Sequence, residues 1–554
     1  MNKQVSASAK RIVKTCITGQ KWRIIISSLL SVLTSVIYVG LALISKQIID
    51  IATKVQSGKL TLLTIGIIAL IIFQVAASAA LSHLKAAASG KMAISIRKSL
   101  FTSLLTKQYS EVSKYHSGDL LNRFTSDCDV VVTTAAGLIP SIASIIAKII
   151  AGAVTLLFID WKFAAGLIVL GIFVPAVCKL IGTKYRSIHK NHQQSEGKIK
   201  AFLQENFKNL SVIKSFPSLR PTFKKLNNLQ VDNYDLKIMR NNLNIIYGTG
   251  MVLFFTAGYF LVLLWGAAGI AAGSVTVGSL IAFLQIISQL RAPMQSISAI
   301  MPSYYSMLSS ADRLAEIVDL QEEISPLDKN MFDAIEKMFT VINADGLSFS
   351  YGDKPILKSC NFALKRGSIT VITGESGVGK STLFKLLLGY YKGNGGFLRF
   401  DNKYDINSST RAFFSYVPQG NMILSGTIRE NLTLCCEKTD DKSIAAAVKT
   451  AVLDKWIDTL PNGLDTFIGE DGLGVSEGQA QRIAIARAIL CDAPILLLDE
   501  ATAALDGETE AQLLYNIKKL SNKTVILVTH RSLDQSICDT HLHLEDGYMK
   551  EIIY

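Results

Sequence analysis

Residues 374–382, GESGVGKST, fit the pattern G-x-x-x-x-G-K-[ST], which wraps phosphate groups. They follow the apolar run SITVIT, which we expect to be a strand, and they open a helical stretch. Glycines here let backbone N–H groups surround an anion at a helix N-terminus. Lys380 would add a positive charge for the β- and γ-phosphates, and Ser381 a hydroxyl ligand for Mg²⁺. The nucleotide contacts expected in this segment are Gly374, Ser376, Gly377, Gly379, Lys380, Ser381 and Thr382.

Two acids follow a second apolar run, ILLL at 495–498. Ligand groups of open α/β sheets collect at the carboxyl ends of the strands, so Asp499 is expected to hold Mg²⁺. Glu500 would then polarise the attacking water as general base. His530 follows the run TVILVT, and we interpret it as a γ-phosphate contact. The alternatives are a helix cap for the acids and an ordinary buried side chain for the histidine.

The elements that must position these residues begin near residue 340. There, short β-rich runs alternate with helical ones, which predicts an α/β domain with a partly parallel sheet. In such a sheet, strand ends that carry polar residues face one crevice.

The first part of the chain is far more apolar. The whole chain has 49% hydrophobic and only 18% charged residues, which favours a membrane protein. Stretches long enough to cross about 30 Å of hydrocarbon as helices lie near 24–45, 61–83, 136–158, 163–182, 246–268 and 276–300. We therefore predict an α-helical six-span domain followed by the α/β domain.

The basic residues indicate how this domain is oriented. The formal net charge is +13, and the excess lies in the N-terminal segment and in the two long loops, 85–130 and 184–245. Because cytoplasmic loops are enriched in Lys and Arg, these parts and everything after residue 300 are expected in the cytoplasm. Nucleic acid is a poorer explanation of the charge and is not expected as a partner. Both loops have helical spacing, so we expect the spans to continue as helices, with surface helices as the alternative.

These observations divide the chain into four parts. They are a cytoplasmic N-terminal segment (1–23), the membrane domain (24–300), a linker (301–338) and the nucleotide-binding domain (339–554). The eight cysteines show no metal-ligand or disulfide-framework spacing, and we expect them to be reduced.

The ordered motifs make the chain resemble the ATP-binding cassette (ABC) transporters, specifically the exporter-type half-transporters, over essentially its whole length. The motifs are Tyr351, the phosphate loop, Tyr416–Gln419, 424–432, 468–472, the signature at 475–479, Asp499–Glu500, 504–506 and His530. In the membrane part, HSGDLLNRFTSD (116–127) and ENFKNLSVIKSF (205–216) are similar to stretches that flank the family's coupling helices.

The resemblance implies roles that the residues alone do not. Tyr351 would contact the adenine ring, and Gln419 would take part in catalysis and Mg²⁺ binding. Ser476, Gly478 and Gln479 would bind the ATP that is held by the opposite subunit, so a homodimer or heterodimer is required. The signature departs from the usual L-S-G-G-Q at Glu477, which is either a tolerated surface variant or the cause of a weakened site.

Together these features predict a multi-pass protein of the bacterial inner membrane that hydrolyses ATP and exports a hydrophobic, lipidic, peptide or drug-like solute by alternating access. Import of a metal chelate and a membrane-anchored ATPase that gates or senses are the alternatives. Lys148 lies in the middle of the third span, and the six spans contain no Asp or Glu. We expect it to face the cavity and favour a negative or strongly polar solute, or to be hydrogen-bonded between helices.

Overall fold

The computed structural model describes residues 7–552 except 54–59, 160, 162–186, 189–190, 208, 216, 218, 421, 437–438, 470–473, 521–522 and 531–537. The chain forms two compact units. Unit 1 comprises Met1–Leu104 and His116–Asp319, and unit 2 comprises Leu105–Tyr115 and Leu320–Tyr554. The short segment Leu105–Tyr115 therefore belongs with the C-terminal unit, although unit 1 contains the residues on either side of it.

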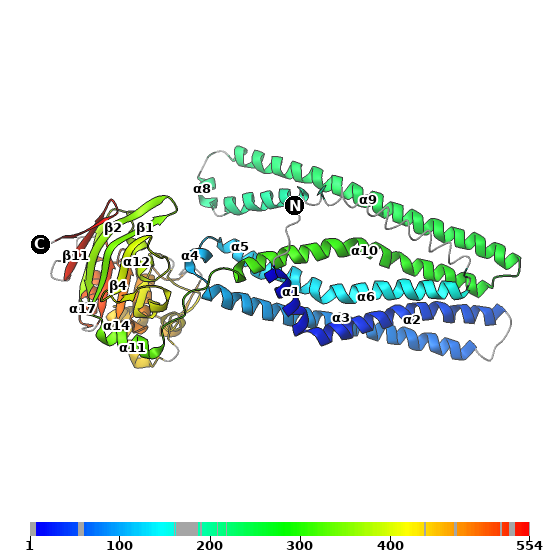
Figure 1. Cartoon of the computed structure of the whole chain (residues 1–554), viewed down its shortest axis with the longest axis horizontal. Helices are drawn as coiled ribbons and strands as arrows, with labels where there is room; N and C mark the ends of the chain where they lie inside the picture. The colour runs from blue at the N-terminus through cyan, green and yellow to red at the C-terminus, as the bar shows by residue number, and fades with distance from the viewer. Residues whose placement is uncertain are drawn as a thin grey trace. The chain divides into compact units, whose positions relative to one another are not determined.

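Unit 1 is helical (Figure 1). Its main helices are α1 (Ala7–Gly19), α2 (Lys21–Thr53), α3 (Leu60–Thr106), α6 (Cys128–Ile159), α9 (Arg220–Ala271) and α10 (Val277–Val318). Its short elements include α5 (Ser117–Asn122), the π-helix η1 (Arg123–Asp127) and α8 (Leu210–Lys214).

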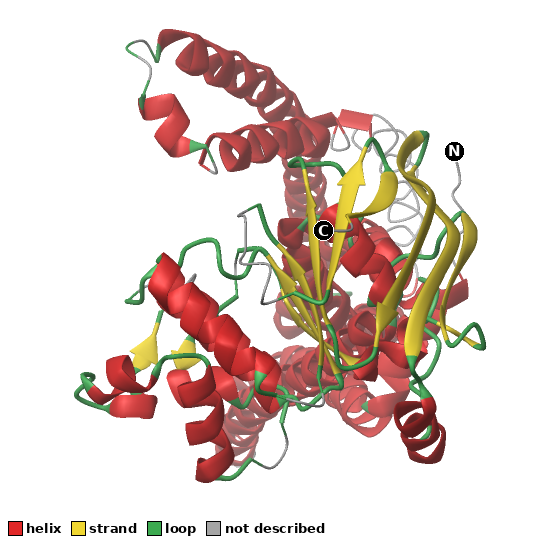
Figure 2. Ribbon diagram, turned by 90° about the vertical axis from the view of Figure 1, so that its left-hand side faces the viewer, coloured by secondary structure: helices red, strands yellow, loops and turns green. Residues whose placement is uncertain are grey.

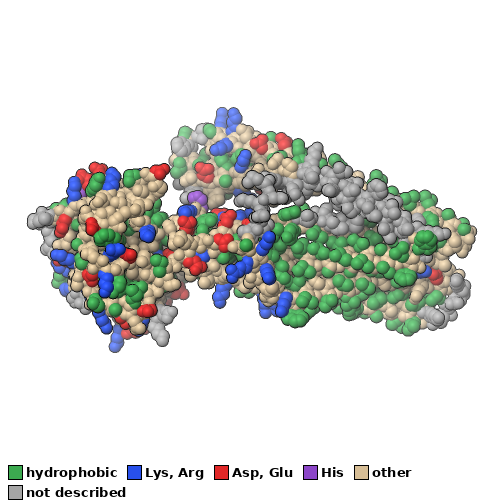
Figure 3. Space-filling model, in the orientation of Figure 1, with side chains coloured by type: hydrophobic (Ala, Val, Ile, Leu, Met, Phe, Trp, Pro, Cys, Tyr) green, Lys and Arg blue, Asp and Glu red, His purple; other side chains and the backbone are tan. Residues whose placement is uncertain are grey.

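Five of the six predicted spans lie within α2, α3, α6, α9 and α10, and the predicted span 163–182 lies outside the described residues. Among the described helices, four are long and apolar enough to cross a membrane, and Val277–Pro293 is a shorter apolar helix. Side chains such as Leu62, Ile65 and Ile72 on α3 are exposed. Figure 3 shows hydrophobic side chains covering the visible face over α2, α3 and α6, as lipid contact requires.

The helices α3 and α9 are much longer than a membrane span requires. These helices have 47 and 52 residues, which at 1.5 Å per residue gives lengths of roughly 70 to 80 Å. A bilayer core is only about 30 Å thick, so both helices extend well beyond it.

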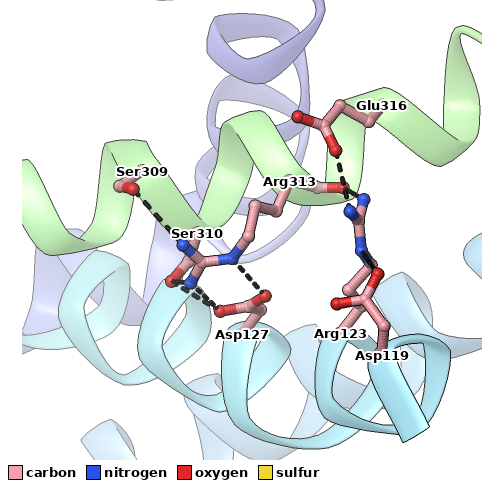
Figure 4. A network of polar contacts seen from close by, with 7 residues as sticks. All are labelled: Asp119, Arg123, Asp127, Ser309, Ser310, Arg313 and Glu316. Carbon is pink, nitrogen blue, oxygen red and sulfur yellow. Dashed lines mark hydrogen bonds and ion pairs between the residues drawn. The ribbon is translucent and has the colours of Figure 1, made fainter. Parts of the chain in front are cut away.

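A polar network ties η1 to α10 inside unit 1 (Figure 4). The carboxylate of Asp127 is 3% exposed and accepts hydrogen bonds from the Arg313 guanidinium and, at 2.9 Å, from Ser310 Oγ. Arg123 is buried as well, and it forms ion pairs with Asp119 at 2.9 Å and Glu316 at 2.8 Å. The stretch 116–127 is thus fixed on α10 by paired charges.

Unit 2 contains two main sheets (Figure 2). The strands β2 (Lys354–Lys365), β1 (Val341–Tyr351), β4 (Gly395–Phe400) and β5 (Tyr404–Asp405) form an antiparallel sheet in that order. The second sheet has the order β12 (Tyr548–Ile552), β11 (Thr540–Glu545), β3 (Ile369–Gly374), β10 (Thr524–Val528), β9 (Ile495–Asp499) and β6 (Phe414–Val417). All its neighbouring pairs except β11 with β12 are parallel, as predicted.

The remaining elements of unit 2 are mostly helices. They are α4 (Tyr109–Val112), α11 (Lys329–Met338), α12 (Lys380–Leu387), η2 (Ser408–Phe413), α13 (Ile428–Leu432), α14 (Asp441–Thr450), α15 (Asp454–Asp458), η3 (Gly463–Asp465), α16 (Glu477–Leu490) and α17 (Gly507–Lys518), with the small strands β7 (Gly426–Thr427) and β8 (Phe467–Ile468).

The central strands are buried on both faces, because successive side chains of a strand point to opposite sides. On β9, Leu497 packs in one core with Phe384 of α12, whereas Leu496 and Leu498 pack in another core with Leu513 of α17. This explains why the sequence shows continuous apolar runs here instead of alternation.

Candidate nucleotide-binding and hydrolysis site

The strands β3, β6, β9 and β10 end at the same edge of the parallel sheet. Val528 is paired with both Ile372 and Asp499, and Val417 is paired with Leu498. Four of the predicted motifs lie at these strand ends: the phosphate loop at β3, Gln419 at β6, Asp499 and Glu500 at β9, and His530 at β10. The register therefore brings together groups that are up to 156 residues apart, since Gly374 and His530 both lie at this edge.

The phosphate loop connects β3 to α12. Gly379 is the N-cap of α12, with φ of 121°. A Cβ at this position would lie 2.7 Å from Cγ2 of Ile356, and the backbone is in a region that side chains disfavour. Gly374 has φ of 149°, and a Cβ there would lie 2.3 Å from the Leu544 carbonyl oxygen. Both glycines are thus required by backbone conformation and by space.

Lys380 is buried at the centre of this loop. Its Nζ donates hydrogen bonds to the carbonyl oxygens of Gly374 at 2.9 Å and Glu375 at 2.8 Å. It also lies 3.2 Å from Nε2 of His530. Burial lowers the pKa of Lys380, while the carboxylates of Glu500 and Asp499 act in the opposite direction. The ammonium group is held where a phosphate enclosed by the loop would meet it.

Asp499 is the last residue of β9 and is almost completely buried. Its Oδ2 accepts a hydrogen bond from the Tyr416 hydroxyl at 3.2 Å, and the Ser381 hydroxyl is close enough to interact with the carboxylate. Burial raises the pKa of Asp499. Its Oδ1 is buried and has no hydrogen-bond partner among the described residues. A buried carboxylate oxygen without a partner, beside a hydroxyl, fits the oxygen ligands that Mg²⁺ prefers.

Glu500 follows in a strained backbone conformation, with φ of 52°. Its N–H donates to the Val528 carbonyl at 3.1 Å, which holds it against the neighbouring strand end. Gln419 Nε2 donates to Oε2 of Glu500 at 2.7 Å, and His530 Nε2 lies 2.9 Å from Oε1. Both oxygens of this carboxylate are therefore oriented by the two side chains that the motifs placed at the neighbouring strand ends.

Tyr351 lies at the end of β1, and its side chain is only partly exposed. Its ring centroid lies 5.3 Å from that of Tyr391 and 4.8 Å from that of Phe349, in edge-to-face contacts. Its hydroxyl interacts with the side chain of Thr382 at the start of α12. The ring is thus anchored next to the phosphate loop, where the expected role against an adenine ring stays a prediction.

The signature residues lie at the N-terminus of α16. Ser476 is the N-cap: its Oγ accepts from the N–H of Gln479 at 3.3 Å, and its own N–H donates to Oε1 of Gln479 at 2.8 Å. A Cβ on Gly478 would lie 3.0 Å from the Ala504 carbonyl oxygen. Among the described residues, no hydrogen bond joins Ser476 or Gln479 to the phosphate loop of the same chain. The structure therefore does not bring the signature and the phosphate loop together.

Glu477 is exposed in the first turn of α16. A carboxylate at this position is favourable towards the positive end of the helix dipole. Of the predicted motif 468–472, residues 470–472 lie outside the described residues.

Two features of this site were not predicted from the sequence. The first is the interaction of Tyr416 with Asp499, although a tyrosine at a strand end next to the expected Mg²⁺ ligand is a usable signal. The second is an aromatic cluster that includes Tyr109 of α4. Tyr109 stacks on Tyr390 and meets Tyr391 edge to face, and Tyr391 in turn contacts Tyr351. Tyr109 is more than 200 residues away from the other members in the sequence, and no local pattern connects it with them.

Lys148 lies between helices. Its Nζ is 5.1 Å from the ring centroid of Tyr38 on α2, in a cation–π contact. One turn away, Ser144 of α6 and Ser35 of α2 are hydrogen-bonded at 2.9 Å. The lysine is half-buried in a polar contact between α2 and α6.

Comparison with known families finds two family models that match separate parts of the chain. Residues 24–294 match the family model described as ABC transporter transmembrane region, and residues 357–503 match the family model described as ABC transporter. Both models occur in one chain, in this order.

Individual proteins resemble the chain over nearly its whole length. The ATP-dependent lipid A-core flippase of Mannheimia succiniciproducens is 29% identical over 531 residues, which cover 92% of this chain and 88% of the flippase. The flippase of the same name from Haemophilus ducreyi is 27% identical, with 97% and 93% covered. A structure of a bacterial Atm1-family ABC exporter with ATP bound matches with a TM-score of 0.80 at 23% identity, covering 96% of this chain and 94% of the exporter chain. This last likeness establishes the fold.

Proposed function

This chain belongs to the ABC transporter family, and we propose that it is one half of an ATP-driven exporter that moves a lipidic solute across the membrane as a dimer. The observation that carries the proposal is the constellation at the sheet edge. Gln419 and His530 both contact Glu500, next to Lys380 and Asp499. The same chain contains helices that are long and apolar enough to cross a membrane.

Each residue of the constellation has a role in hydrolysis. Glu500 accepts a proton from the attacking water, and Gln419 and His530 orient its carboxylate. Lys380 neutralises charge on the β- and γ-phosphates. Asp499 and Ser381, with Gln419, would hold Mg²⁺, and the bound ion would supply positive charge for the phosphate oxygens. Tyr351 packs against the adenine ring.

A dimer is part of the proposal, because no hydrogen bond joins the signature to the phosphate loop in the described part of the chain. In the dimer, Ser476, Gly478 and Gln479 of one subunit complete the ATP site of the other. The second half is a copy of this chain or a related half-transporter. ATP that is bound by both subunits favours the closed arrangement, since a ligand shifts an equilibrium only through differential affinity.

The solute is proposed from two observations. The relatives from Mannheimia and Haemophilus are named lipid A-core flippases, which supports a lipidic solute. The six predicted spans contain no Asp or Glu, so Lys148 has no counter-ion there, and its ammonium group rests on the ring of Tyr38. A solute with a negative group would supply the missing charge. We place the protein in the bacterial inner membrane, with its N-terminus and unit 2 in the cytoplasm.

Reconstitution tests the proposal. The purified dimer would be placed in proteoliposomes with outward-facing nucleotide-binding units, together with a fluorescent acidic lipid. We expect ATP to move the lipid into the inner leaflet, which corresponds to export from a cell, and Glu500→Gln to prevent it. Movement in the opposite direction would indicate an importer. ATP hydrolysis without movement of any tested lipid, peptide or drug-like compound would indicate a gating or sensing ATPase.

A further inference from the structure

Three thiols meet in unit 2, away from the phosphate loop. Cys435 and Cys436 follow α13, and Cys491 is the C-cap of α16. The thiol of Cys491 is in side-chain hydrogen-bonding contact with the thiols of both Cys435 and Cys436. Cys436 Sγ also donates to the carbonyl oxygen of Leu490 at 3.3 Å. All three cysteines are free.

The two segments that bear these thiols are fixed to each other without any covalent bond. Arg487 of α16 donates to Asn431 of α13, with 2.7 Å to the backbone oxygen and 3.1 Å to Oδ1. Leu432 of α13 and Ile483 of α16 are buried in one hydrophobic cluster. The thiols are therefore brought together by the packing of these two segments.

The thiols differ in access and in chemical environment. Cys435 is exposed, whereas Cys491 is only partly accessible. Burial, and then the neighbouring thiols, raise the pKa of Cys491 to about 12, so it stays protonated. Because Cys435 is exposed, it is the thiol of the three that a dissolved oxidant reaches first.

We propose that Cys435 and Cys491 form a reversible redox site, which peroxide closes to a disulfide and a dithiol reductant reopens. The Cys435 thiolate attacks hydrogen peroxide, the O–O bond breaks, and a sulfenic acid and hydroxide form. The sulfur of Cys491 then attacks the sulfenic sulfur. The S–S bond forms, the S–O bond breaks, and water leaves with the thiol proton. A dithiol reductant restores both thiols by exchange and becomes a disulfide itself.

The bond would close a loop that contains α14, α15 and α16, with the signature in the part of the loop nearer to Cys491. Because α13 and α16 already share one rigid cluster, the bond leaves Ser476 in place and restrains only the unfolded chain. The oxidised protein should therefore melt a few degrees higher and retain its ATPase activity within a factor of about two. This effect is independent of which solute is transported.

Peptide mapping of the full-length protein tests the site. The purified protein in lipid would be treated with hydrogen peroxide, its remaining thiols alkylated, and its tryptic peptides analysed without reduction. We expect the peptide with Cys435 linked to the peptide with Cys491, and release by dithiothreitol. The link should persist in Cys436→Ser and in the control Cys538→Ser, and should be absent in Cys435→Ser and Cys491→Ser.

Other outcomes would overturn the proposal. These are a bond between Cys435 and Cys436, a bond between Cys436 and Cys491 in the wild type, or oxidation to sulfinic acid without any link. Thermal unfolding of oxidised and reduced wild type provides a second measurement that does not depend on the variants folding. An oxidised protein that melts no higher than the reduced one would refute the stabilising role.

Discussion

The ring of Tyr109 stacks on the ring of Tyr390, with centroids 4.3 Å apart and planes inclined by 21°. Tyr390 lies just after α12, the helix that begins with Lys380, and Tyr109 belongs to α4, which lies between α3 and α6 in the sequence. Lys107, two residues before Tyr109, forms an ion pair with Glu322 at 3.1 Å. The stacking of Tyr109 on Tyr390 therefore attaches the segment Leu105–Tyr115 next to α12, the helix of the phosphate loop.

Tyr109→Ala should uncouple transport from hydrolysis. An aromatic pair contributes about 1 kcal/mol beyond its buried area. Its loss would lower the equilibrium constant for the packing of α4 against Tyr390 about fivefold. We expect solute-stimulated ATPase and transport to fall by about this factor, while basal ATPase changes little. Tyr109→Phe keeps the stacking and is the matched control. Equal activities for the alanine and phenylalanine variants would show that the stacking has no part in coupling.

Glu500→Gln should abolish turnover and leave ATP binding intact, because it removes the base but keeps the shape of the side chain and the Asp499 ligand. General-base catalysis contributes about 10²- to 10⁴-fold, and kcat should fall within this range or further. Binding of a fluorescent ATP analogue and single-turnover hydrolysis would measure the two effects. The exposed Glu508 at the start of α17 provides the control Glu508→Gln. Hydrolysis at the wild-type rate by the Glu500 variant would exclude it as the base.

Glu477→Gly should leave ATPase activity within a few-fold of wild type or raise it. A carboxylate near a phosphate is unfavourable unless it is solvated, and Glu477 is exposed. Glu477→Gln separates the effect of charge from that of backbone flexibility. Steady-state ATPase assays at several salt concentrations would detect the electrostatic part. A large loss of activity in both variants would assign a positive role to the carboxylate.

Lys148→Met should reduce solute-stimulated ATPase and spare basal ATPase, because it retains chain length and removes the charge. Lys148→Arg retains the charge and the cation–π contact with Tyr38, so it should behave like wild type. The measurement is ATPase stimulation by an acidic lipid compared with a zwitterionic one. If the acidic lipid stimulates the methionine variant as strongly as wild type, Lys148 contributes only to the contact between α2 and α6.

Asp127→Asn should destabilise unit 1. It leaves the Arg313 guanidinium without its buried partner, and breaking a buried ion pair costs several kcal/mol. Because the Arg313 side chain is 42% exposed, we expect a smaller loss, on the order of 2 kcal/mol. Thermal unfolding in detergent would measure it. The control is Asp129→Asn, which removes the exposed pair with Arg97 and should have little effect.

The sequence by itself determined the class of each part of the chain. Apolar stretches of about 20 residues have few stable states other than a spanning helix, and α2, α3, α6, α9 and α10 contain five of those predicted. The phosphate loop was recognisable because its glycines are dictated by local backbone conformation, as the positive φ angles of Gly374 and Gly379 show. The parallel sheet was predicted from continuous apolar runs, which arise because both faces of its strands are covered.

Only the tertiary structure decided which side chains meet. The parallel register places Gln419 and His530 on the two oxygens of Glu500, although they come from different strands. Segment Leu105–Tyr115 joins unit 2 through the stacking of Tyr109, and Cys491 meets Cys435 through the packing of α16 on α13. Such contacts depend on how elements pack across long sequence separations, and sequence patterns reveal only the conformation and the buried face of each element.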